Sequence, residues 1–493
     1  MREMCYLRGT NGLHSQEDSK TNNEKYCMDK KKIAALCIVV ASMGAAWAQG
    51  GITPEMLSQM RDAEAALPQS TAIANALASN KIDDLAQTRA AKAGLDDHFS
   101  VVTPDQPIHN QMSSGRCWMF SGLNVLRADY ALANADTMAV EFSHNYLFFF
   151  DQLEKANLML QGVIDHADKD MEDERVRFFF KHPVSDGGTF CGIIDLATKY
   201  GLVPKSVFPE TFSAENTSKM SQIVNSKLRE FGLELRAMVA AGDTTEAITA
   251  RKTEMLAEIY HILSLALGEP PTRFEYIIRN NDGTAVSTQT VFTPEEFFNI
   301  TVGRDLSEQY IMVMNDPRRP YHKTYEVEYD RHTYDGHNWV YLNLPVEEIE
   351  QLAIASLKDG RKMYSSYDVG KQLDRKRGYL ALDNYDYASL FGTTFDMNKA
   401  ERIATFDSGS THAMTIDAVD LDADGRPLKW RVENSWGSTS GQAGKIIMTA
   451  DWFKEYMFRL VVDKKYVPKK LLKEYEQEPV LVMPEDPLFG ADD

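Results

Sequence analysis

Three short stretches far apart in the sequence carry the side chains of one chemical mechanism, so the fold has to bring them together. The first is Gln111-Met112-Ser113-Ser114-Gly115-Arg116-Cys117-Trp118, with a glutamine six residues before a cysteine. The others are Thr411-His412-Ala413-Met414 and Glu433-Asn434-Ser435-Trp436-Gly437. A thiol that attacks a carbonyl carbon needs an imidazole that keeps it ionised, a group that orients the imidazole, and hydrogen-bond donors for the oxyanion.

Each role in this mechanism has one candidate residue. Cys117 is the expected nucleophile, and its backbone N–H together with the Gln111 side-chain amide would bind the oxyanion. His412 would exchange the proton, the side-chain oxygen of Asn434 would orient the imidazole, and Trp436 would shield the bond between them. Taken singly, a cysteine is usually a small buried residue and a histidine a structural group. Their shared order and spacing favour the catalytic interpretation.

Periodicity predicts the secondary structure that would hold these side chains. Cys117 should begin a helix that continues from Trp118 through Leu132, because the free N–H groups at a helix N-terminus stabilise a thiolate. Alternating apolar residues from His412 to Ala418 predict a half-buried strand, and Lys429 to Glu433 predicts a second strand. A hairpin between the two strands would return Asn434 to the neighbourhood of His412.

The sequence shows no cluster of metal ligands and no phosphate-binding loop, so we expect neither a metal nor a cofactor. Asp420-Leu421-Asp422-Ala423-Asp424-Gly425 resembles the start of a calcium-binding loop, but Arg431 stands where a bidentate glutamate is required. The segment also lies between the two predicted strands, where Asp-Gly is a common hairpin turn. Of the five cysteines, Cys191 is expected to be buried near a helix start and not paired with Cys117.

Several further stretches point to a family. They are Ser143-His144-Asn145-Tyr146-Leu147-Phe148-Phe149-Phe150-Asp151 with Leu153-Glu154-Lys155-Ala156-Asn157, Asp186-Gly187-Gly188, Lys199-Tyr200-Gly201-Leu202-Val203-Pro204-Lys205, Leu267-Gly268-Glu269-Pro270-Pro271, and Tyr367-Asp368-Val369-Gly370-Lys371 with Asp386-Tyr387 and Leu390-Phe391-Gly392. With them, the chain resembles the bleomycin hydrolase / aminopeptidase C branch of the papain-like cysteine peptidases, from about residue 95 to about residue 490. The papain-type pattern has a cysteine where Ser114 stands, and Ser114 cannot form the corresponding disulfide bond.

The resemblance implies an α+β, papain-like two-subdomain fold, with the active site in a cleft between a helical half carrying Gln111 and Cys117 and a β-rich half carrying His412 and Asn434. In simple papain-like enzymes the histidine lies about 130–150 residues after the cysteine, whereas here the separation is 295 residues. The surplus of about 150 residues predicts a large, mainly helical insertion, with helices over Ser218–Phe231 and Thr245–Leu267. The expected domains are an N-terminal helical segment (49–98), the helical half (99–215), the insertion (216–360), the β-rich half (361–470) and a C-terminal arm (471–493).

The N-terminal region has the pattern of a secretory signal peptide. Met28-Asp29-Lys30-Lys31-Lys32 gives a basic start, an apolar run extends from Ile33 to Ala48, and Ala46-Trp47-Ala48 offers an A-x-A cleavage site. We therefore expect a signal peptide over 28–48, cleavage after Ala48, and a secreted or periplasmic protein without a membrane anchor. Residues 1–27 are polar and patternless, which favours Met28 as the true start. The alternative is a cytoplasmic protein with an apolar first helix.

The acidic composition bears on the expected partners. The formal net charge is −19 at pH 7, whereas binding nucleic acid through its phosphates needs clustered lysines and arginines. Some members of the resembled family bind nucleic acid, but we do not expect this chain to do so. The resemblance alone implies a homohexamer, and it implies peptides as substrates.

The C-terminal arm determines which peptides we expect to be cut. In the resembled family this arm lies in the cleft, and its terminal carboxylate meets the free amine of the substrate. The sequence departs from the family near its end, because Phe489 looks inserted and two aspartates close the chain. Asp493 is therefore a candidate substrate contact, together with Trp118 and Trp436. The predicted function is a secreted aminopeptidase that acts through a thioester acyl-enzyme; the alternatives are a secreted endopeptidase and a non-catalytic binding protein.

Overall fold

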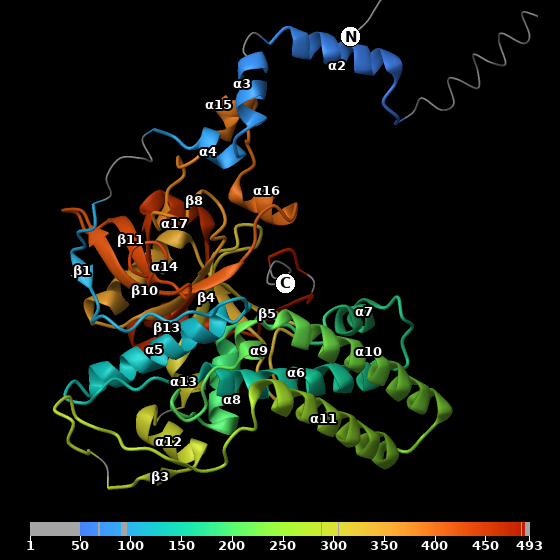
Figure 1. Ribbon diagram of the computed structural model, residues 1–493, viewed down its shortest axis with the longest axis vertical. Helices are drawn as coiled ribbons and strands as arrows, with labels where there is room; N and C mark the ends of the chain where they lie inside the picture. The colour runs from blue at the N-terminus through green and yellow to red at the C-terminus, as the bar shows by residue number, and fades with distance from the viewer. Residues whose placement is uncertain are drawn as a thin grey trace, which may run out of the picture. The chain divides into compact units, whose positions relative to one another are not determined.

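The computed structural model describes residues 50–67, 70–89, 96–286, 288–303, 305–484 and 486–488 (Figure 1). The predicted signal peptide (28–48), the segment before it and Asp493 lie outside these residues. The described residues up to Lys81 form one compact unit, and those from Ile82 onward form another. The first unit contains helices α2 (Pro54–Ala65) and α3 (Ser70–Leu77), and no residue of α2 is buried. In the described part of the chain, no helix is both long and apolar enough to cross a membrane.

The second unit is built on a large mixed sheet. Twelve strands of the described chain belong to it, in the order β14-β5-β6-β4-β13-β7-β10-β11-β12-β9-β8, with β1 paired to β10. The strands are β1 (Val101–Val102), β4 (Tyr310–Met314), β5 (Lys323–Val327), β6 (Val340–Asn343), β7 (Met363–Tyr367), β8 (Leu373–Asp374), β9 (Tyr379–Leu380), β10 (His412–Leu421), β11 (Pro427–Glu433), β12 (Lys445–Thr449), β13 (Met457–Asp463) and β14 (Val480–Val482). A separate ribbon pairs β2 (Phe274–Glu275) with β3 (Val291–Phe292).

Helices form the other half of this unit and also cover the sheet (Figure 1). The helical half contains α5 (Cys117–Ala133), α6 (His144–Asp165), α7 (Glu174–Lys181), α8 (Phe190–Tyr200), α9 (Phe212–Glu215), α10 (Ser218–Ala241), α11 (Thr245–Leu267), α12 (Pro294–Thr301) and α13 (Leu306–Gln309). Around the sheet lie α4 (Ile82–Ala86), α14 (Val346–Lys358), α15 (Tyr387–Phe391), α16 (Lys399–Ala404), α17 (Ala450–Tyr456), the 3-10 helix η2 (Lys464–Tyr466) and α18 (Lys469–Tyr475). The expected α+β division, with Gln111 and Cys117 in a helical half and His412 and Asn434 in a β-rich half, is confirmed.

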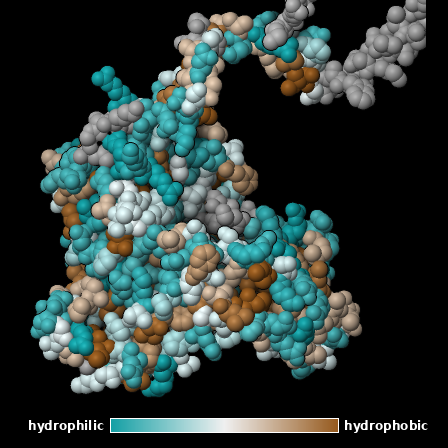
Figure 2. Space-filling model, viewed as in Figure 1, coloured by the Kyte–Doolittle hydropathy of each residue, from teal (hydrophilic) through white to brown (hydrophobic). Residues whose placement is uncertain are grey.

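Hydrophilic side chains predominate on the face shown in Figure 2.

Strand β10 is buried on both faces, and the prediction of a half-buried strand was therefore wrong. Thr415 on one face contacts helix α5, because its hydroxyl donates to the backbone oxygen of Ser121 at 3.3 Å. Met414 and Ile416 on the other face belong to a second hydrophobic core, which includes α14 and α17. Periodicity reports which residues alternate, but it cannot report that a helix from a distant part of the sequence covers the expected polar face.

Helices make up most of the regular structure of the expected insertion (216–360), and strands of the central sheet enter it in its second part. Helices α10 and α11 cover the predicted ranges and pack against α6 and each other. A left-handed Gly242 (φ 81°) ends α10, and the Thr244 side chain caps α11, so the chain reverses between them. From Tyr310 to Asn343, strands β4, β5 and β6 join the central sheet, a feature that the prediction of a mainly helical insertion did not include. Strand β13, with which β4 pairs, follows more than 100 residues later and gives no local signal.

Candidate active site

Cys117 is the first residue of α5, as predicted. The helix is anchored firmly, since every residue from Trp118 to Tyr130 is buried. Cys117 itself is half-buried, and the backbone N–H of Ala413 on β10 points at its sulfur with an N···Sγ distance of 3.4 Å. A helix N-terminus and a second backbone donor both favour the thiolate over the thiol.

His412 and Asn434 meet across the hairpin of β10 and β11. The distance from His412 Nε2 to Asn434 Oδ1 is 2.8 Å. The backbone N–H of Ser435 also donates to Asn434 Oδ1, at 2.8 Å, so the orientation of the amide is fixed. Because an amide oxygen can only accept, His412 Nε2 carries the hydrogen and Nδ1 is the nitrogen that can exchange a proton with Cys117.

Burial governs the protonation of His412. It lowers the pKa of the imidazole to about 4, the hydrogen bond to Asn434 opposes this, and the nearby Arg375 cation adds to the lowering. The ring of Trp436 stacks on His412 with centroids 4.9 Å apart, and the Arg375 guanidinium lies 4.3 Å from the centroid of Trp436. The tryptophan therefore covers the imidazole as expected, whereas Arg375 was not anticipated and carries no sequence signal of its own.

The Gln111 side chain is held rigidly next to these groups. Its Nε2 donates to the backbone oxygen of Ser114 at 2.5 Å, and its Oε1 accepts from the hydroxyl of Ser435. The Ser114 hydroxyl in turn donates to the Gln111 backbone oxygen at 2.6 Å and accepts from Arg116 Nε at 3.0 Å. Hydrogen bonds thus hold the turn before Cys117, at the position where the papain-type pattern has a disulfide bond.

One small cavity, of about 170 Å³, brings the predicted residues together. Its lining consists of Gln111, Gly115, Cys117, Gly187 and Gly188 from the helical half, and Tyr364, Ser366, Ser410, Thr411, His412, Ala413 and Arg459 from the sheet. We call it the catalytic cavity. Asn434 lies directly behind His412 and does not line it. Glycine residues on one wall and strand residues on the other leave room for a peptide backbone next to Cys117.

The two predicted tryptophan contacts do not line this cavity. Trp118 is 1% exposed, its Nε1 donates to the backbone oxygen of Asp186 at 2.7 Å, and its ring packs against His332. The prediction that Trp118 contacts substrate is therefore corrected: the side chain points into the core, because α5 turns this face toward α6. Trp436 covers His412 from outside the cavity, and Asp493 lies outside the described residues.

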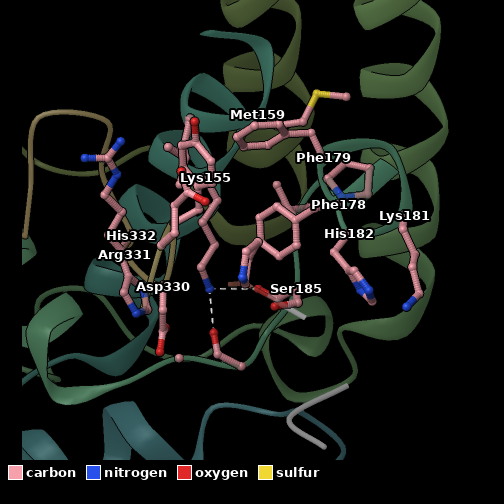
Figure 3. Close-up of a pocket in the computed structure, with 18 of the residues that line it drawn as sticks. Lys155, Met159, Phe178, Phe179, Lys181, His182, Ser185, Asp330, Arg331 and His332 are labelled. Atoms are coloured by element: carbon pink, nitrogen blue, oxygen red, sulfur yellow. Dashed lines mark hydrogen bonds between the residues drawn. The ribbon is translucent and has the colours of Figure 1, made fainter. Parts of the chain in front are cut away.

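A larger cavity of about 450 Å³ is drawn in Figure 3. It adjoins the first cavity, because Gly187 and Gly188 line both. Apolar side chains of α6 and α7 form one side of it, with Met159, Phe178 and Phe179 among them. Pro484 from the C-terminal segment and Phe406 contribute to its lining as well. Sequence reasoning missed this cavity, because it lies between helices and loops that are distant in the chain.

The C-terminal segment is anchored beside the catalytic cavity. The Asp486 carboxylate accepts from Arg318 Nη2 and Arg319 Nη2, each at 2.6 Å. Leu488 is completely buried, and its carbonyl oxygen accepts from the backbone N–H of Ser410 at 3.4 Å. Two charged groups and one apolar side chain therefore fix this segment at the rim of the cavity.

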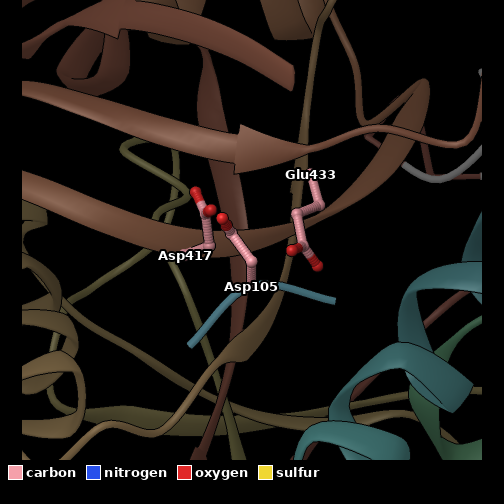
Figure 4. A group of neighbouring side chains, drawn as sticks. All are labelled: Asp105, Asp417 and Glu433. Carbon is pink, nitrogen blue, oxygen red and sulfur yellow. The ribbon is translucent and has the colours of Figure 1, made fainter. Parts of the chain in front are cut away.

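Three carboxylates that approach one another do not form a metal centre in the described chain. Asp105, Asp417 and Glu433 place one oxygen each within 4.8 Å of the others (Figure 4). However, Lys445 Nζ lies 2.6 Å from an oxygen of Asp105 and 2.7 Å from an oxygen of Asp417. Arg431 forms three hydrogen bonds to Asp417, and Lys362 pairs with Glu433. Three cations already compensate the three anions, so the group is an ion-pair network.

The remaining predictions about cysteine and calcium can be checked directly. Cys191 is buried at the second position of α8, 2.8 Å from Thr189 Oγ1, and is not joined to Cys117 by a disulfide bond. The candidate calcium loop is a hairpin turn, because Asp422 accepts from the backbone N–H groups of Asp424 and Arg426, both at 2.9 Å. Both predictions are confirmed.

Comparison with known proteins now identifies the family. A model of the Peptidase C1-like family matches residues 51–489. The chain belongs to this family. Among its relatives, aminopeptidase C from Lactobacillus delbrueckii subsp. lactis is 39% identical over 420 residues, which cover 84% of this chain and 93% of that protein. Bleomycin hydrolase from Homo sapiens is 38% identical over 431 residues, covering 85% and 94%.

A solved structure agrees with this assignment to the Peptidase C1-like family. The crystal structure of PepW from Lactobacillus rhamnosis HN001 matches with a TM-score of 0.85 at 36% identity, and it covers 89% of this chain and 99% of PepW. The resemblance to the bleomycin hydrolase / aminopeptidase C branch is confirmed, and the protein is a papain-like cysteine peptidase.

Proposed function

We propose that this member of the Peptidase C1-like family is an aminopeptidase, which releases single residues from the free N-terminus of peptides. The observation that carries the proposal is the anchoring of the C-terminal segment, with Leu488 hydrogen-bonded to Ser410 on the rim of the catalytic cavity. In the resembled family the C-terminal arm offers a carboxylate to the free amine of the substrate, and we infer the same role for the acidic residues that follow Leu488 in the sequence. The relatives named aminopeptidase C support the same activity.

In the proposed reaction, the Cys117 thiolate adds to the carbonyl carbon of the N-terminal residue. The Cys117 backbone N–H and the Gln111 amide donate hydrogen bonds to the oxyanion that forms. The His412 imidazolium then gives its Nδ1 proton to the leaving amine, the C–N bond breaks, and a thioester remains. Water adds to this thioester while His412 takes up a proton, and the thiolate leaves as the amino acid is released.

Asn434 and Trp436 would support the charge changes of His412. A buried imidazole resists protonation, as its lowered pKa indicates. The imidazolium is therefore favoured mainly when the neighbouring sulfur is a thiolate, which compensates its charge. The hydrogen bond from Nε2 to Asn434 holds the ring in one orientation throughout, and Trp436 keeps water away from that bond.

The test of the proposed function is turnover of an aminoacyl fluorogenic amide with a free amine and of its acetylated counterpart, under thiol reductant. Turnover of the free-amine compound alone, abolished by Cys117→Ala, is the expected result. Equal turnover of both compounds would favour an endopeptidase with an open cleft. Failure of Cys117→Ala to reduce turnover of either compound would refute the proposed nucleophile.

Secretion and assembly are part of the same proposal. The basic start at Met28, the apolar run and the A-x-A site at Ala46–Ala48 support export with cleavage after Ala48. Cell fractionation and N-terminal sequencing of the exported protein test this, and a mature protein that retains residues 28–48 would contradict it. A homohexamer is proposed on the family resemblance alone, and light scattering after size exclusion would contradict it by giving a monomer.

A further inference from the structure

The loop Ser185–Gly188 forms a wall between the catalytic cavity and the larger cavity. A buried lysine donates hydrogen bonds to the backbone of this loop. Lys155 Nζ on α6 donates to the backbone oxygen of Ser185 at 3.0 Å and to that of Gly187 at 2.6 Å (Figure 3). Its third bond, also 3.0 Å, goes to Asp151 Oδ2. An ammonium group has three N–H donors, and these bonds use all of them. Lys155 therefore acts on the loop and has no donor left for a ligand.

Other side chains complete this anchoring of the loop. Gln152 Nε2 donates to the Ser185 oxygen at 2.9 Å, and Trp118 Nε1 donates to the Asp186 oxygen at 2.7 Å. Three successive backbone oxygens, from Ser185 to Gly187, thus face buried donors. The positions of these donors therefore determine the position of the Gly187–Gly188 backbone, which lines the catalytic cavity.

A buried histidine, His332, contacts the end of the same loop. The backbone N–H of Thr189 donates to His332 Nε2 at 3.2 Å, so Nε2 is the acceptor and Nδ1 carries the hydrogen, which it donates to Asp151 at 2.5 Å. The ring also fills the space next to Gly188, where an added Cβ would lie 2.1 Å from His332 Cε1. Asp151 thereby connects Lys155, which binds Ser185 and Gly187, with His332, which accepts from Thr189 immediately after the loop.

The charges in this network are balanced. Asp151 is completely buried; burial alone would raise its pKa, but Lys155 and His332 outweigh burial and the pKa lies below its usual value. Lys155 and Asp151 form a buried ion pair, and His332 Nδ1 donates to the same carboxylate. Removing Lys155 would take away the donor to the Gly187 oxygen, one of the two donors to the Ser185 oxygen and the cation that pairs with Asp151, so the loop would lose much of its anchoring.

We propose that Lys155 is a positioning residue for peptide binding: anchored to Asp151, it fixes the Gly187–Gly188 wall of the catalytic cavity through backbone carbonyls. This inference rests on the proposed peptidase function. Cys117 and His412 belong to α5 and β10, whereas the three hydrogen bonds of Lys155 go to Asp151, Ser185 and Gly187. Loss of Lys155 should therefore weaken substrate binding and leave the reacting groups in place.

The test compares Lys155→Met with Lys399→Met. Lys399 on α16 is a matched control, because it is also buried and donates to three oxygens, of Asn315, Lys454 and Met457, but lines neither cavity. For the free-amine amide, Lys155→Met should raise KM about tenfold or more, with kcat changed less than about threefold. Lys155→Arg, which keeps the charge and the donors, should recover part of the loss, and Lys399→Met should leave KM unchanged.

A second readout does not require turnover. Cys117 is alkylated with an aminoacyl chloromethyl ketone, which has to fit against the wall, and with iodoacetamide, which does not. The ratio of the two rate constants should fall about tenfold in Lys155→Met and stay constant in Lys399→Met. If wild-type protein turns over no amide, the proposed function fails while this ratio still decides the role of Lys155.

An unchanged KM and an unchanged alkylation ratio in Lys155→Met would overturn the inference, as would an equal effect of Lys399→Met. If Lys155→Met does not fold, Gln152→Leu removes one bond to Ser185 and one to Asp151 and keeps Lys155. It should raise KM two- to threefold, by the same movement of the wall on a smaller scale. A fall in kcat at constant KM in that variant would show that the network acts on the reacting groups and would refute the proposal.

Discussion

Replacing Asp486 with alanine should release the C-terminal segment and admit peptides with blocked N-termini. The carboxylate accepts two charge-assisted hydrogen bonds from Arg318 and Arg319, and its side chain is 9% exposed. Such bonds contribute about 1.5–3 kcal/mol each, so the pair is worth at least about 3 kcal/mol. Both arginines keep Asp316 as a partner, so the substitution strands no cation. About 3 kcal/mol corresponds to a factor of about 100 between seated and released segments.

The assay is the ratio of kcat/KM for acetylated and free-amine versions of one fluorogenic peptide. Because the buried Leu488 still holds the segment in part, we expect the ratio to rise about 10- to 100-fold in Asp486→Ala. Asp359→Ala, which removes an exposed carboxylate bonded to Lys465, serves as control and should leave the ratio unchanged. A wild-type ratio in Asp486→Ala would refute the idea that this anchor excludes blocked peptides.

Three further changes test the site and its support. Asn434→Ala removes the acceptor that orients His412 and should lower kcat about 100-fold with little change in KM, as steady-state kinetics would show. Burial lowers the pKa of His412 to about 4, below the value of about 6.5 expected when unfolded, so the unfolded state binds the proton first as the pH falls. In the Cys117→Ser variant, denaturant titrations should show that the free energy of unfolding falls by up to about 3 kcal/mol as the pH drops from 6.5 toward 4. In the double variant with His412→Phe, the contribution of His412 to this fall should disappear. Gly188→Ala places a methyl group 2.1 Å from His332 and 2.8 Å from Trp118 and should lower the unfolding free energy by about 1–3 kcal/mol or more; Gly425→Ala, with no atom within 4 Å, should cost only about 1 kcal/mol for its positive φ.

Local features of the sequence predicted the elements around the site closely. The helix expected over 118–132 spans Cys117–Ala133, and the two expected strands pair as an antiparallel hairpin whose turn is closed by Asp422. These features depend on neighbouring residues: apolar spacing, a helix start and an Asp-Gly turn. Residues far apart in the chain were predicted to meet only because one mechanism requires them together.

Contacts between distant segments could not be predicted in the same way. Trp118 was expected at the substrate and instead lies in the core, because its position on α5 relative to α6 is a property of packing. His332 meets Asp151 across 181 residues, and Arg375 reaches Trp436 from another loop. None of these pairs has a local pattern that would mark it.

The sequence by itself determined the chemistry of this protein. It combines a cysteine at a helix start with a glutamine, a histidine and an asparagine, and few mechanisms other than thiol catalysis use this set of residues. The tertiary structure alone decided which side chains face the peptide and which hold the walls. Lys155, His332 and Asp486 act through backbone groups and ion pairs that exist only once α6, the central sheet and the C-terminal segment have packed together. Burial also decided the low pKa of His412, because desolvation depends on every segment that surrounds the ring.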